Sequence, residues 1–150
     1  MGIKICPADN FNDSTVSFPE LSETYDYLIH ELVRRELGFI TLLRRGCDVG
    51  AANAAGARPE GKELPPGYDT LEHFGPLVKY PGSKTLLLVN HEYTVEEANE
   101  LVQKGLIDMV VFSRFFIHNP VNSQEMEILC GIQLTGYCRI WSPALEMGFL

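Results

Sequence analysis

The sequence predicts an α/β fold of about four parallel βα units, which corresponds to half of a (β/α)8 TIM barrel. Short apolar segments alternate with longer segments of helical periodicity, a pattern typical of βαβ units on a parallel sheet. The apolar run Met109 to Phe112 ends abruptly at Ser113-Arg114, as expected for a strand buried on both faces. The 150 residues suffice for one domain but not for the about 250 of a complete barrel.

The first unit begins with a short strand that contains Ile3 and Ile5, followed by the polar loop Asp9 to Thr15. Ser17 and Glu20 have the spacing of a capping box, so we expect a helix to begin at this point. One face of that helix carries apolar side chains at helical spacing, namely Leu21, Tyr25, Leu28, Leu32 and Val33.

Gly38 is predicted to end the first helix, and Phe39 to Leu43 forms the second strand. Arg44 and Arg45 follow at its C-terminal end, where they either reach the mouth of the barrel or remain solvated in a loop. The next segment, Gly46 to Gly67, is rich in Ala, Gly and Pro and has no clear periodicity. We expect it to be a mobile loop.

The third and fourth units follow the same pattern. Tyr68 to Leu77 is a short helix candidate, and Thr85 to Val89 is the third strand. Thr94 and Glu97 form a second capping box. Its helix ends at Lys104-Gly105, and the side chains expected to face inward are Val95, Ala98, Leu101 and Val102. Met109 to Phe112 is the fourth strand, and Asn122 to Cys130 and Pro143 to Met147 are candidate terminal helices.

Composition excludes several classes of partner. The formal charge of −8 and the pI of about 4.9 argue against nucleic acid and anionic membranes, which require clustered Lys and Arg. No apolar run reaches the roughly 18 residues of a membrane span, and Met1 to Pro7 is not a signal peptide. We therefore expect a cytoplasmic protein. The four cysteines lack CxxC spacing, so we predict thiols and no metal site.

Several motifs resemble the old yellow enzyme family, the FMN-dependent ene-reductases, and the similarity runs nearly end to end. The most specific is Phe112-Ser-Arg-Phe-Phe-Ile-His-Asn-Pro120, which resembles the last barrel strand of that family. The other similar segments are Gly2 to Pro7, Phe39 to Arg44, Leu88 to Tyr93, Gly131 to Leu134 and Gly148-Phe149. The resemblance covers the C-terminal half of the family's barrel. It therefore implies that the proton-donating Tyr and the substrate-binding His pair or His/Asn pair of the family lie in the half that this sequence lacks.

The resemblance also implies cofactor contacts. Arg114, next to Ser113, corresponds to the arginine that helps to hold the flavin phosphate, and Lys4 stands where the family has a flavin-contacting arginine. The glycine-rich turn that cradles the FMN phosphate is replaced by His91-Glu92. Glycines permit close approach to phosphate, whereas a carboxylate repels it. We therefore expect either no cofactor or weakly bound FMN.

The candidate catalytic residues are His91, Glu92 and Lys4. His91 and Glu92 follow a barrel strand, at the end where such folds place catalysis, and a histidine can transfer protons near neutral pH. Lys4 can stabilise an oxyanion, and strand alternation would direct it to the same side as Gly2 and Cys6. The alternatives are a solvated strand-end turn for His91 and Glu92 and an ordinary salt bridge for Arg114.

Three hypotheses for function follow. The first is a truncated enzyme that acts on a small conjugated carbonyl compound (an enone), in specialised metabolism, by non-redox proton transfer as an isomerase or epimerase. The second is an FMN-dependent NAD(P)H ene-reductase that needs a second chain to complete the barrel, and the third is a non-catalytic remnant. The open sheet edges of a half-barrel attract other strands, so we expect a homodimer that closes the barrel. A flattened sheet that covers itself is the alternative.

Overall fold

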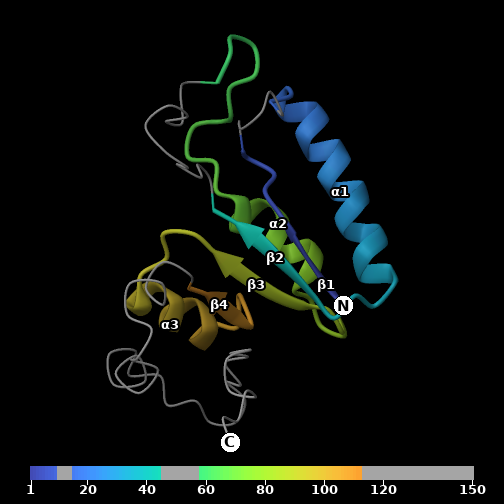
Figure 1. The fold of residues 1–150 in the computed structure, drawn as a ribbon, viewed down its shortest axis with the longest axis vertical. Helices are drawn as coiled ribbons and strands as arrows, with labels where there is room; N and C mark the ends of the chain where they lie inside the picture. The colour runs from blue at the N-terminus through green and yellow to red at the C-terminus, as the bar shows by residue number, and fades with distance from the viewer. Residues whose placement is uncertain (10–14, 45–57, 113–150) are drawn as a thin grey trace, which may run out of the picture.

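A computed structural model describes residues 1–9, 15–44 and 58–112, and within these ranges four strands alternate with three helices (Figure 1). The alternation agrees with the predicted βα units. The strands are β1 (Gly2–Ile5), β2 (Phe39–Leu43), β3 (Leu86–Asn90) and β4 (Met109–Val111), and the helices are α1 (Phe18–Arg34), α2 (Thr70–Val78) and α3 (Val95–Gln103).

The four strands form one parallel sheet in the order β1-β2-β3-β4. Ile3 pairs with Ile40 of β2, which pairs with Leu87 of β3, and Val89 pairs with Val110 of β4. The predicted fold class of about four parallel βα units is therefore confirmed. Spatial order and chain order coincide, because each helix returns the chain to the next position in the sheet.

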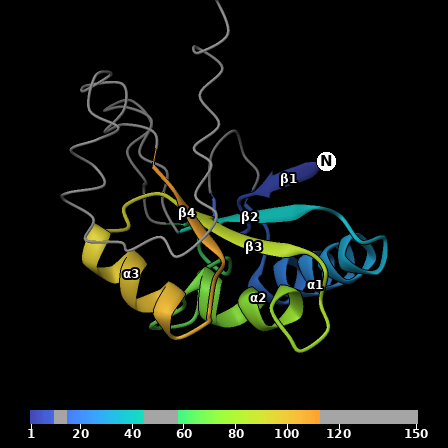
Figure 2. The same ribbon diagram turned by 90° about the horizontal axis from the view of Figure 1, so that it is seen from below.

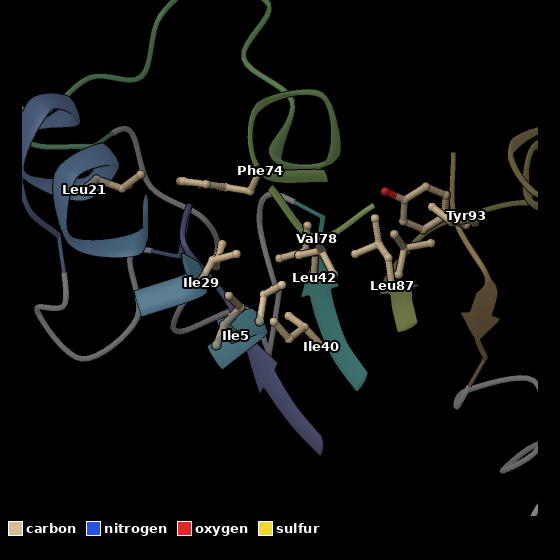
Figure 3. Close-up of a cluster of buried hydrophobic side chains, with 12 residues drawn as sticks. Ile5, Leu21, Ile29, Ile40, Leu42, Phe74, Val78, Leu87 and Tyr93 are labelled. Atoms are coloured by element: carbon tan, nitrogen blue, oxygen red, sulfur yellow. The ribbon is translucent and has the colours of Figure 1, made fainter. Parts of the chain in front are cut away.

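All three helices lie on the same side of the sheet (Figure 2). Side chains alternate between the two faces of a strand, so every second strand residue points toward the helices. The core forms between these layers (Figure 3). Its strand members are Ile5, Ile40, Leu42, Leu87 and Val89, and its helix members include Leu21, Ile29, Val33, Phe74 and Val78.

Helix α1 begins as predicted but ends differently. The Glu20 carboxylate accepts hydrogen bonds from the Ser17 backbone N–H at 3.1 Å and from the Ser17 hydroxyl at 2.7 Å, so the capping box is confirmed. The left-handed residue after the helix is Glu36, with φ of 53°, rather than Gly38. Gly38 instead lies against the first residue, because its N–H donates to the Met1 carbonyl at 2.9 Å and a Cβ would come within 3.0 Å of that oxygen.

Other predicted boundaries shift by one or two residues. Helix α2 begins at Thr70 rather than Tyr68, because Asp69 acts as N-cap and accepts from the Glu72 N–H at 3.0 Å. Strand β3 runs from Leu86 to Asn90 rather than from Thr85 to Val89. Val102 was expected to face inward but is exposed, whereas Ala98 is buried. The predicted helices Asn122 to Cys130 and Pro143 to Met147 lie outside the described residues.

The segment before α2 is bound to the loop that follows β1. Arg58 donates to the carbonyls of Ala8 at 3.2 Å and Val16 at 2.9 Å, and the Lys62 ammonium donates to the Thr15 carbonyl at 2.8 Å. These hydrogen bonds from two cationic side chains join residues 58–62 to Ala8, Thr15 and Val16. The mobile loop expected over 46–67 stays a prediction, since 46–57 lies outside the described residues.

The N-terminal end of β4 is anchored by Asp108. Its carboxylate accepts from the Leu87 N–H at 2.8 Å and pairs with the Lys79 ammonium, and its own N–H donates to the Leu87 carbonyl at 2.9 Å. These contacts join β4, β3 and the end of α2 at the end of the sheet where the strands begin, opposite the strand C-termini. Within the described ranges, no helix has both the length and the apolar character needed to cross a membrane.

The left-handed Glu36 provides a test of local stability. A side chain at such a position costs free energy that glycine avoids. The ion pair of Glu36 with Lys84, at 2.6 Å, is exposed and contributes little. We expect Glu36→Gly to raise the free energy of unfolding by about 0.5 kcal/mol, measured by chemical denaturation. The matched control is Glu36→Ala, which removes the same ion pair but keeps the Cβ and should give no gain. Equal effects of the two variants would contradict the explanation.

Candidate functional site

The face of the sheet opposite the helices carries a chain of polar contacts. Lys4 alternates with Ile5, which is in the core, and with Ile3, which packs against the core, so it lies on this second face. Its ammonium donates to Asn90 Oδ1 at 2.8 Å, and the Asn90 amide nitrogen donates to the Val111 carbonyl. One polar line therefore runs across the sheet from β1 to β4 near the strand C-termini.

The Lys4 ammonium is suited to binding an anionic oxygen. Asn90 is buried and Lys4 is an exposed residue of β1, so a buried amide fixes the position of the Lys4 ammonium. An ammonium has three N–H donors, and the contact with Asn90 uses one of them. In parallel α/β folds of the barrel type, the C-terminal end of the strands is where catalytic groups gather.

The two residues after Asn90 form a left-handed turn. His91 has φ of 80° and Glu92 has φ of 55°, a conformation that costs free energy in residues other than glycine. The His91 side chain is 8% exposed and that of Glu92 63% exposed, and His91 Nε2 lies 3.6 Å from Glu92 Oε1. That distance is too long for a hydrogen bond.

Arg44, at the end of β2, makes a set of contacts that we call the Arg44 clasp. Its guanidinium donates to both oxygens of the Glu97 carboxylate and, at 3.1 Å, to the Glu92 carbonyl. The guanidinium carbon lies 3.7 Å from the centroid of the Tyr93 ring, a cation–π arrangement. Arg44 was expected either to reach the mouth of the barrel or to be solvated, and neither description fits these contacts.

Tyr93 is a residue of the hydrophobic core. The side chain is buried and belongs to the same hydrophobic cluster as Leu87 (Figure 3). Burial raises the pKa of Tyr93 to about 12, although Arg44 acts in the opposite direction. The phenol is therefore neutral at physiological pH and provides a surface for the Arg44 guanidinium.

Other residues singled out in the sequence have different positions. Ser113 and Arg114, predicted to hold a flavin phosphate, lie outside the described residues. Strand β1 ends at Ile5, so the alternation that would align Cys6 with Lys4 does not extend to Cys6. Across residues 1–9, 15–44 and 58–112, no group of three or more His, Cys, Asp or Glu side chains could hold a metal ion.

Sequence reasoning missed the contribution of Asn90. A polar residue that ends an apolar strand is a signal for a barrel mouth, and Asn90 follows Leu86 to Val89 directly. The spacing of the chain does not reveal its partner, because Lys4 and Asn90 are 86 residues apart. The alignment of β1 with β3 through β2 brings them together.

Comparisons with known proteins identify the fold. No family model matches the sequence, and no curated protein matches it. Three solved structures with similar folds are morphinone reductase (23% identity, TM-score 0.59), the old yellow enzyme homologue of Zymomonas mobilis (21%, 0.57) and the old yellow enzyme of Trypanosoma cruzi (18%, 0.52). The chain has the fold of part of an old yellow enzyme barrel, as the sequence motifs predicted.

The similarity covers most of this chain but only a small part of each solved structure. The matched region covers 85%, 89% and 77% of this chain in the same order, but 29%, 32% and 25% of those proteins. The chain therefore spans about a quarter to a third of their length. At these levels of sequence identity, the comparison shows a similarity of fold alone.

The Arg44 clasp predicts a pH dependence of stability. Hydrogen bonds from Arg44 lower the pKa of Glu97 below its usual value, so the stabilisation is complete above the usual carboxyl pKa and is lost as the pH falls through the lowered value. We expect Glu97→Gln to be less stable than the unmodified protein at neutral pH by up to about 1 kcal/mol, since both side chains are partly exposed. The difference should shrink as the pH falls below about 5. Denaturation at several pH values measures it, and a difference independent of pH would contradict the assignment.

Proposed function

We propose that this chain supplies part of an enzyme that transfers a proton within a small conjugated carbonyl compound, as an isomerase or epimerase. The observation that carries the proposal is the Lys4 ammonium, held 2.8 Å from Asn90 Oδ1 on the second face of the sheet. Asn90 directly precedes the turn that bears His91. A fixed cation and a proton acceptor thus lie at the same end of the sheet, where barrel enzymes place catalysis.

The reaction follows from the chemistry of these groups. His91 takes a proton from carbon next to the conjugated carbonyl, so a C–H bond breaks, an N–H bond forms and the electron pair moves to the carbonyl oxygen. Lys4 donates a hydrogen bond to that oxygen and stabilises the enolate. Glu92 Oε1 lies 3.6 Å from the Nε2 atom of the ring that receives the proton. Return of the proton to another carbon, or to the other face, gives an isomer without any oxidant or reductant.

A second candidate is an FMN-dependent ene-reductase, which is favoured by the fold shared with morphinone reductase. The described residues do not fit the FMN phosphate that the resemblance would place at the His91–Glu92 turn. Glu92 brings a carboxylate to this turn, and the neighbouring cation Arg44 is committed to Glu97. Arg114 and Ser113 could provide phosphate contacts, but they lie outside the described residues. We therefore rank proton transfer first.

The proposed partner that completes the barrel is a second copy of the chain. In the described sheet, β1 and β4 are the edge strands, and unpaired parallel edges favour association with further strands. Two copies related by a twofold axis along the barrel would place β4 of each beside β1 of the other. Both Lys4 ammonium groups would then face one enclosed interior.

Solvent deuterium exchange tests the proton transfer. We expect the purified protein to exchange a C–H of small cyclic enones with D2O, monitored by NMR. Lys4→Met should lower the rate by about 100-fold, the order found when one oxyanion donor is removed, and His91→Ala should abolish exchange. The matched control is Lys84→Met, which removes an exposed lysine paired with Glu36 and should leave the rate unchanged. Equal rates in Lys4→Met and Lys84→Met would remove Lys4 from the mechanism.

The visible absorbance spectrum after addition of FMN, together with a molecular mass, separates the alternatives. We expect no bound-flavin spectrum, because the Glu92 carboxylate opposes a phosphate at the turn, and a mass twice that of one chain. A bound-flavin spectrum accompanied by oxidation of NAD(P)H would favour the reductase instead. A folded monomer would contradict the proposed closure of the barrel by two copies.

A further inference from the structure

We infer that Arg44 is a positioning residue for the site, because it holds the left-handed His91–Glu92 turn in place from the neighbouring strand. This inference rests on the proposed function of that turn. Arg44 itself would not contact the substrate. Its role would be to fix the position from which His91 acts.

Two contacts from Arg44 bracket the turn. The Arg44 backbone N–H donates to the Asn90 carbonyl at 3.0 Å, before the turn, and the guanidinium donates to the Glu92 carbonyl at 3.1 Å, at its end. His91 lies between these two acceptors. One residue of β2 therefore constrains the backbone on both sides of the proposed proton acceptor.

The guanidinium is in turn fixed by two further groups. Glu97, in the first turn of α3, binds both of its terminal nitrogens, and the Tyr93 ring lies 3.7 Å from its central carbon. Tyr93 is a buried member of the core. The planar fork of arginine suits such a bidentate and stacked site, and lysine cannot reproduce it.

Backbone strain explains why the turn needs this support. Two successive residues with Cβ atoms have positive φ, and such conformations persist only where the surrounding contacts over-determine them. Without the clasp, we expect the turn to relax and the His91 ring, which is 8% exposed, to become more accessible.

Accessibility of His91 tests the inference without relying on turnover. The full chain is treated with diethyl pyrocarbonate, and the modification rates of His91 and the exposed His30 are compared by peptide mass spectrometry. We expect the ratio of the His91 rate to the His30 rate to rise about tenfold in Arg44→Gln and in Glu97→Gln, the size of effect that loss of a charge-assisted hydrogen bond gives. Arg44→Lys should be intermediate, because a lysine can retain the pairing with Glu97 alone.

Lys79→Gln is the matched control. Lys79 is also partly buried and pairs with a carboxylate, that of Asp108, but at the opposite end of the sheet. In the Lys79→Gln variant, the ratio of the His91 rate to the His30 rate should equal that of the unmodified protein, even though the variant is less stable. An unchanged ratio in both Arg44→Gln and Glu97→Gln, or an equal rise in Lys79→Gln, would overturn the inference. If Arg44→Gln does not fold, Glu97→Gln decides the question.

The outcome is separable from that of the proposed function. A protein that shows no deuterium exchange but has the expected modification ratios would refute the proton-transfer chemistry and retain the role of Arg44 in holding the turn. If exchange is observed, we expect Arg44→Gln to lower kcat about tenfold with little change in KM, and Arg44→Lys to recover part of the loss.

Discussion

Side-chain alternation along four parallel strands, in a single register, is the constraint on which the rest of this structure depends. The register aligns Ile3, Ile40 and Leu87 across three strands, so these side chains share one face and meet the helices. The same register places Lys4 on the other face, together with the side chain of Asn90. A shift of one residue in any strand would exchange the two sets. Burial of the aliphatic side chains against α1 and α2 thus also places the polar side chains on the opposite face of the sheet.

Local chemistry explains the parts of the fold that could be predicted from the sequence. The capping box of Ser17 and Glu20 depends on residues three apart, and the strand Phe39–Leu43 depends on five consecutive residues. Both signals are complete within a short stretch of chain. The end of α1 was predicted less well, because Gly38 has the residue type of a helix terminator, yet it is needed for close approach to the Met1 carbonyl. The left-handed position falls on Glu36 instead.

The candidate site could be predicted only in part, because its contacts join distant segments. Lys4, on a strand, and His91, directly after one, were predicted from their residue types, and their catalytic roles stay predictions. Asn90 and the Arg44 clasp were not predicted, since the spacing between Arg44 and Glu97, 53 residues, carries no periodic signal. Their pairing follows from the adjacency of β2 and β3 and from the position of α3 after β3. Knowledge of the sheet order is therefore needed before the partners of these charges can be identified.

The coincidence of chain order and sheet order has a consequence for biosynthesis. Each strand pairs with the strand that precedes it in the chain. When a new βα unit leaves the ribosome, the strand with which it pairs has therefore already been synthesised. Synthesis at about 5–20 residues per second is slow compared with helix and loop formation, which take microseconds or less. The sheet can thus grow one strand at a time during translation. Until the next strand is synthesised, the strand added last is the edge strand of the growing sheet. The unpaired backbone groups of that strand are then exposed to chaperones.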